Sequence, residues 1–152
     1  MSSPFSALIA ELATFVKASP EQALDSPVEF DIDGTVITLH LDSNSGQDEI
    51  ILSASLGVIE EKAELKTYRV LLEGNLFWSA TNDATIGVNS ETREAFITFK
   101  CPMSQLNGEA LAQLMAHFLQ IVLPWKELIA ANNANPENDG FTQKPSVDLL
   151  KV

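Results

Sequence analysis

Two aspartates two positions apart come nearest to a catalytic pair in this chain. Asp31 and Asp33 stand in the segment Phe30-Asp31-Ile32-Asp33-Gly34-Thr35-Val36. Side chains two residues apart on an extended segment point to the same side, so both carboxylates could face one substrate. A pair of this kind can supply a nucleophile and a general acid.

The same segment resembles the first motif of haloacid-dehalogenase-type phosphotransferases. That resemblance implies that Asp31 attacks phosphorus and that Asp33 is the general acid. The family also needs a parallel doubly wound sheet, a later lysine and a late acidic pair that holds magnesium, whereas Asp139 and Asp148 here lie in a polar C-terminal segment. Short motifs match by chance when their context is missing. We therefore expect no enzyme and no catalytic residue, and keep a phosphatase using Asp31 and Asp33 as the alternative.

The other residue types that bind metals or act as nucleophiles are isolated. His40 and His117 have no Cys or His partner at metal-ligand spacing. Cys101 is the single cysteine, which excludes an internal disulfide. Its predicted position at a strand end on an apolar face favours a packed thiol over an activated one. We expect no metal site and no cofactor.

Size and charge limit the classes of partner. The 152 residues are enough for one ordinary domain, and 9 Lys and Arg against 21 Asp and Glu give a net charge of −12. Such a field repels phosphate backbones and anionic lipids, so we expect no nucleic-acid partner. A basic or amphipathic protein segment is favoured, although a solvated face that only keeps the chain soluble explains the charge as well.

The sequence also argues against export and membrane insertion. No uninterrupted apolar run approaches the ~20 residues that span a bilayer. The segment 1–16 contains no Lys or Arg, so it lacks the basic start of a signal peptide. We expect a cytoplasmic bacterial protein without membrane insertion.

The elements that would position the two aspartates form a predicted β-hairpin. Apolar and polar residues alternate with a period of two on both sides of Asp33-Gly34. This dipeptide suits a two-residue type I′ turn, which needs positive φ at both positions. The turn fixes three cross-strand pairs that put the large apolar side chains on one face: Ile32 with Thr35, Phe30 with Ile37, and Val28 with Leu39. The turn therefore explains why Asp33 and Gly34 stand together without giving either residue a catalytic role.

The remaining periodicities complete an α+β pattern. Ser3-Pro4 predicts the start of a first helix that ends at Ser19-Pro20. Further strands are predicted at 50–56, 84–88 and 95–101, and further helices at 60–76 and 104–130, the last kinked or cut by Pro124. The order is α-β-β-β-α-β-β-α with an antiparallel sheet. We expect one domain over 1–131 and a polar, mobile tail over 132–152.

This order, with five local motifs, resembles the class I type III secretion chaperones (the Tir chaperone family). The similarity covers about residues 5–130, and its motifs are Leu52-Ser-Ala-Ser-Leu-Gly57, Leu71-Leu72-Glu-Gly-Asn75, Ile86-Gly-Val88, Ala95-Phe-Ile-Thr-Phe99, and Trp125 followed by Leu128. The chain departs from the family pattern at Asn89, where aspartate is common, at the aromatic pair Phe77-Trp78, at Pro124 and in the tail.

The resemblance implies binding rather than chemistry. Such chaperones form homodimers through the second helix and the later strands, and hold an extended segment of a secreted effector at a sheet edge and in apolar grooves. The resemblance implies that the dimer candidates are Tyr68, Leu72, Leu76, Phe77 and Trp78. It also implies that the effector-binding candidates are Phe5, Leu12, Phe15, Phe30, Ile37 and Leu39. Burial in the core is the competing interpretation for both sets, and an adaptor of the same fold without a secretion role is a further alternative.

Overall fold

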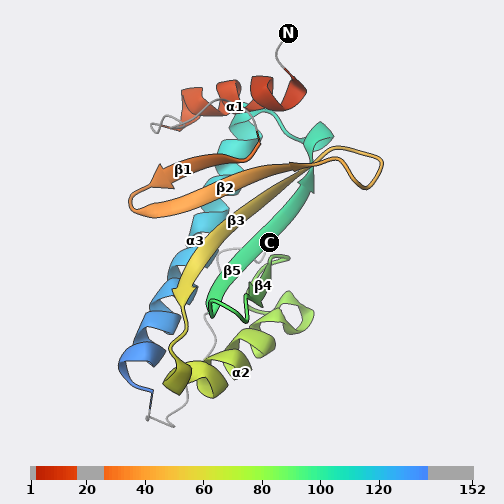
Figure 1. Ribbon diagram of the computed structural model, residues 1–152. Coiled ribbons are helices and arrows are strands. Elements are labelled where there is room, and N and C mark those ends of the chain that lie inside the picture. The colour runs from red at the N-terminus through yellow and green to blue at the C-terminus, as the bar shows by residue number, and fades with distance from the viewer. Residues whose placement is uncertain (1–2, 17–25, 137–152) are drawn as a thin grey trace. The chain divides into compact units, whose positions relative to one another are not determined.

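The computed structural model describes residues 3–16 and 26–136 (Figure 1). The elements follow the predicted order: α1 (Pro4–Phe15), β1 (Val28–Ile32), β2 (Thr35–Asp42), β3 (Glu49–Val58), η1 (Glu61–Ala63), α2 (Glu64–Asn75), η2 (Leu76–Trp78), β4 (Thr85–Val88), β5 (Glu94–Pro102), η3 (Met103–Gln105) and α3 (Gly108–Ala134). The strands form an antiparallel five-stranded sheet in the order β1-β2-β3-β5-β4. The predicted α+β fold is confirmed.

The first helix begins where the sequence predicted. The Ser3 side chain is the N-cap and accepts a hydrogen bond from the Ser6 backbone N–H at 3.1 Å. Pro4 follows at the first helical position, where its missing N–H costs no hydrogen bond. The helix ends at Phe15, where Val16 turns to an extended backbone, so it stops before the predicted end at Ser19-Pro20, which itself lies outside the described residues.

The β1–β2 hairpin has the predicted turn and register. Asp33 and Gly34 have φ values of 52° and 89°, as a type I′ turn requires. The strand pairs are the three predicted, Ile32 with Thr35, Phe30 with Ile37 and Val28 with Leu39. Because that register puts the apolar side chains on one face, four of them are at most 1% exposed: Val28, Phe30, Ile37 and Leu39.

Within the described residues the chain divides into two compact units. The described part of the first unit comprises residues 3–16, 26–54 and 99–118. Its core joins α1, the hairpin and the start of α3, with Phe5, Ile9, Leu12, Leu52 and Leu111 at most 2% exposed. Within it, the Gly108 backbone N–H donates to Glu11 Oε1 at 2.9 Å, which ties the start of α3 to α1.

The described part of the second unit comprises residues 55–98 and 119–136. Trp125 is fully buried here, and its indole Nε1 donates to the Ala80 carbonyl oxygen at 3.0 Å. Asn132 is 1% exposed, and its side-chain amide donates to Thr67 Oγ1 at 3.2 Å. This bond holds the last turn of α3, so the helix ends at Ala134 instead of the predicted Ala130. Residues 137–152 of the predicted tail lie outside the described residues.

Of the two effects predicted for Pro124, a kink or a break, the break does not occur, because α3 continues through it. A proline inside a helix removes one hydrogen bond, here to the carbonyl of the exposed Gln120, which water can reach. Contrary to expectation, α3 is long and apolar enough by length and composition to cross a membrane. The same composition is typical of a buried core helix, and Met115, Val122 and Ile129 of α3 are at most 1% exposed.

Candidate functional site

Asp31 and Asp33 do not form an active site. Both are exposed, and Asp31 Oδ1 accepts a hydrogen bond from the Gly34 N–H at 2.9 Å. The carboxylate therefore closes the hairpin turn, a common role for aspartate. Among residues 3–16 and 26–136, no group of three His, Cys, Asp or Glu side chains is placed to hold a metal ion.

Cys101 is a packed thiol rather than an activated one. The side chain is half-buried. Burial, and to a lesser extent the negative charge of Glu49, raises the pKa of the Cys101 thiol. A raised pKa lowers the thiolate fraction at neutral pH and with it the reactivity.

The most unusual surface in the described chain is the outer face of α2. The inner face of this helix is buried through Thr67, Val70, Leu71 and Gly74. The dimer candidates Leu72 and Leu76 point the other way and are 71% and 60% exposed, so the core interpretation is wrong for both leucines. Leu65, about two helical turns before Leu72 and therefore on the same face, is also 66% exposed.

Two aromatic residues of η2, which directly follows α2 in the chain, are exposed as well. Phe77 is 86% exposed and Trp78 is 54% exposed. Both have left-handed backbones, with φ values of 52° and 54°. That conformation costs an L-residue about 1–2 kcal/mol and is unusual for bulky side chains. We call the set Leu65, Leu72, Leu76, Phe77 and Trp78 the α2 apolar face.

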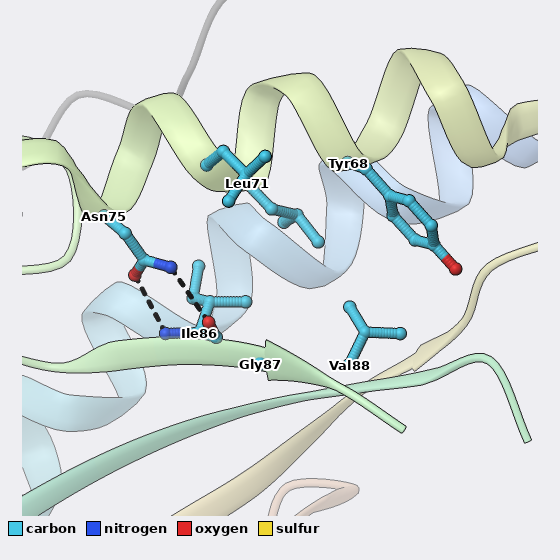
Figure 2. Close-up of a pocket in the computed structure, with 7 residues that line it drawn as sticks. Tyr68, Leu71, Asn75, Ile86, Gly87 and Val88 are labelled. Carbon is cyan, nitrogen blue, oxygen red and sulfur yellow. Dashed lines mark hydrogen bonds between the residues drawn. The ribbon is translucent and has the colours of Figure 1, made fainter. Parts of the chain in front are cut away.

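A hollow of ≈ 260 Å³ lies beside this face, between α2 and β4 (Figure 2). Its lining is mainly apolar: Tyr68, Leu71, Leu72, Asn75, Ile86, Gly87 and Val88. In Figure 2 the Val88 side chain points from β4 toward α2, and the Tyr68 ring points from α2 toward β4.

Asn75 closes one end of this hollow by clamping α2 to β4. Its Oδ1 accepts from the Ile86 backbone N–H at 2.9 Å, and its Nδ2 donates to the Ile86 carbonyl oxygen at 2.8 Å (Figure 2). The side-chain amide thus satisfies the two backbone groups as a neighbouring strand would. Sequence reasoning missed this role, although Asn75 ends one of the family-like motifs.

The six residues predicted to bind effector are mostly inside the first unit. Five of them are at most 2% exposed: Phe5, Leu12, Phe30, Ile37 and Leu39. Phe15, at the end of α1, is 53% exposed. Only this last side chain is open to a ligand without rearrangement of the unit.

The comparisons with known proteins agree with this fold. A search of curated proteins gave no match. A chain of the HopA1–SchA chaperone–effector complex has a TM-score of 0.60 and 16% identity, with 82% of this chain and 94% of that chain covered. For the ExsC–ExsE complex the TM-score is 0.64 and the identity 22%, with 82% and 92% covered. A chain of the ExoT–SpcS complex from Pseudomonas aeruginosa has a TM-score of 0.56 and 16% identity, with 85% of this chain and 99% of that chain covered.

These likenesses show a shared fold, and the family is shown by a model matched over most of the chain. The Tir chaperone protein (CesT) family model matches residues 7–126. The chain therefore belongs to the Tir chaperone (CesT) family, a non-enzymatic family of type III secretion chaperones.

Proposed function

We propose that the chain binds an extended segment of a secreted effector in the bacterial cytoplasm, by adding that segment to the sheet edge at β1, and keeps it soluble until export. The observation that carries this is the difference between the two edges of the sheet. Among the described residues β1 has one neighbouring strand, β2, whereas β4 at the other edge is clamped by Asn75. An open edge is a template for an added strand.

The hairpin register identifies the backbone groups available at β1. A two-residue turn makes Ile32–Thr35 and Phe30–Ile37 hydrogen-bonded pairs. Glu29 and Asp31, which alternate with them, direct their N–H and C=O groups away from β2. Both carboxylates are exposed, so basic side chains in the added segment would find partners.

The α2 apolar face supports a second part of this proposal, that the chaperone is a homodimer. Monomeric proteins rarely expose contiguous apolar patches larger than a few hundred Å². A standard interface buries about 800 Å² per partner. Five large exposed apolar side chains on one short segment supply much of the centre of such an interface. Of the predicted dimer residues, Leu72, Leu76, Phe77 and Trp78 are exposed and Tyr68 is half-buried.

The client claim is tested by co-expressing the full chain with candidate effectors, beginning with any secreted protein encoded beside it, and measuring the affinity of a purified pair. Glu29→Pro removes an N–H that faces away from β2, so the fold should survive. We expect it to weaken client binding at least tenfold. Glu29→Ala, which keeps the backbone N–H, is the matched control. Equal client affinities for the proline and alanine variants would rule out strand addition at β1.

A further inference from the structure

We propose that Phe77 of one copy inserts into the hollow between α2 and β4 of a second copy, reciprocally about a two-fold axis. This inference rests on the homodimer proposed above and names the contact that specifies it. A two-fold interface uses one surface patch twice, so a projecting side chain and its receptor must both lie on that patch. The second unit carries both.

The projecting part is Phe77. At 86% it is the most exposed large apolar side chain in the described chain. Its left-handed φ of 52° is strained for a phenylalanine. Strain in an exposed aromatic brings no gain within one copy, because the ring contacts little of its own chain. The cost is offset once the ring is buried against a partner, where an aromatic side chain buries about 150–250 Å².

The receptor is the hollow. An apolar cavity of about 150 Å³ in another protein is large enough to bind benzene. The hollow here measures ≈ 260 Å³, so a benzyl side chain fits with room for small adjustments. The two hydrogen bonds of Asn75 to Ile86 hold the helix and the strand apart at a fixed spacing, so the receptor exists before the partner arrives.

The spacing along α2 brings the two parts together. Leu72 is the most exposed apolar residue of α2 and lines the hollow, so we place it nearest the axis of an antiparallel α2 pair. Tyr68 then lies about 6 Å from the axis on one side, at 1.5 Å per residue, and Asn75, the last residue of α2, about 4.5 Å on the other, with Phe77 two residues beyond it. The partner's Phe77 therefore faces the Tyr68 end of the hollow.

Charge favours a second copy over an effector segment as the occupant. The segment from Glu61 to Trp78 has three acidic residues (Glu61, Glu64 and Glu73) and three basic ones (Lys62, Lys66 and Arg69), whereas the chain carries −12. Two such acidic molecules repel each other over most of their surfaces but not here. A basic client is attracted to the acidic remainder of the chain instead.

The test is sedimentation equilibrium of the full chain and two variants. Phe77→Ala removes the inserted ring and leaves the hollow. Val88→Phe fills the hollow from β4 and leaves the ring. We expect each to raise the dimer Kd at least about thirtyfold, as loss of an interface hot spot does. Leu123→Ala is the control, because this residue is 46% exposed on α3. It should leave the dimer Kd unchanged.

Mixing the two variants gives the decisive measurement. A mixed dimer pairs the intact ring of the Val88→Phe copy with the intact hollow of the Phe77→Ala copy. We expect it to be tighter than either variant homodimer by more than the twofold statistical factor. A mixed Kd between those of the two homodimers would overturn the insertion.

Two further outcomes distinguish the insertion of Phe77 from the homodimer on which it rests. A wild-type chain that stays monomeric at micromolar concentration overturns the homodimer itself. A wild-type dimer that neither variant weakens overturns the insertion and leaves the homodimer standing. Circular dichroism checks folding. If Val88→Phe unfolds, Gly87→Phe replaces it, because a Cβ at this lining position meets no atom within 4 Å.

Discussion

The indole of Trp125 lies directly against Gly74, where an added Cβ would come 2.5 Å from both Cη2 and Cζ2 of the ring. A methyl group at position 74 must displace a fully buried ring that also donates to the Ala80 carbonyl. This contact sets how closely α2 and the second half of α3 approach each other within the second unit.

Gly74→Ala should therefore destabilise the protein although alanine is the better helix former. Helix propensity favours alanine by about 1 kcal/mol, whereas overpacking a core costs about 1–3 kcal/mol. Urea unfolding measures the difference, with Gly87→Ala as the control because a Cβ there meets nothing within 4 Å. A Gly74→Ala protein as stable as the wild type would show that the ring yields freely.

Asn75→Asp should lower the free energy of unfolding by about 1–3 kcal/mol, because a carboxylate cannot donate to the Ile86 carbonyl and leaves it facing a negative charge. Asn89 supplies a matched control. Its Oδ1 accepts from the backbone N–H groups of Glu91 and Thr92, a role that aspartate fills equally well. Urea unfolding of the two Asn→Asp variants should differ; equal losses of stability would contradict the clamp.

Leu12→Ala and Phe15→Ser should distinguish a residue of α1 that packs in the core from one that contacts the client. Leu12 is fully buried, so its truncation should cost about 2–5 kcal/mol of stability. Phe15 is 53% exposed, so Phe15→Ser should change stability by no more than about 0.5 kcal/mol. We expect the serine variant to weaken client binding in a pull-down with the purified client. Unchanged binding would remove Phe15 from the contact surface.

Lys100→Met should make stability less sensitive to acid. In the first unit, Lys100 Nζ lies 2.9 Å from Asp42 Oδ2 and 3.1 Å from Glu49 Oε1. The hydrogen bond from Lys100 lowers the pKa of Asp42. The hydrogen bond from Ser45, followed by that from Lys100, lowers the pKa of Glu49. In acid the unfolded chain therefore binds more protons than the folded chain. The stabilisation of the folded chain by the two ionised carboxylates is lost as the pH falls through and below about 4.

Thermal melts at pH 7 and pH 3 check this expectation. The wild type should lose more stability between the two values than Lys100→Met does. Lys62→Met, at an exposed lysine of η1, should behave as the wild type. A steeper acid loss in Lys100→Met than in the wild type would show that the lysine has the opposite effect.

Local rules predicted the parts of the fold that depend on neighbouring residues. The Asp33-Gly34 turn determines the hairpin register, and Ser3 with Pro4 determines the start of α1, because these choices involve atoms a few residues apart. The end of α3 depended on a bond from Asn132 to Thr67, 65 positions away in the chain. No periodicity could indicate it.

The candidate site was predictable in composition but not in direction. The apolar spacing of Leu65, Leu72 and Leu76 is the same whether a helix face meets the core or a partner. Only the buried Val70 and Leu71 on the opposite side show that these three leucines point outward. The backbone of Phe77 and Trp78 could not be foreseen either, because bulky residues rarely adopt positive φ.

The clamp of Asn75 on Ile86 also limits self-association of the protein through its sheet edges. A sheet with two bare edges can join copy after copy, and each addition leaves a new end for the next. Because Asn75 already bonds the Ile86 N–H and C=O in the middle of β4, we expect edge-to-edge joining through β1 to stop at a pair. A protein that handles sticky, extended chains can thus be kept at high concentration without growing into fibrils.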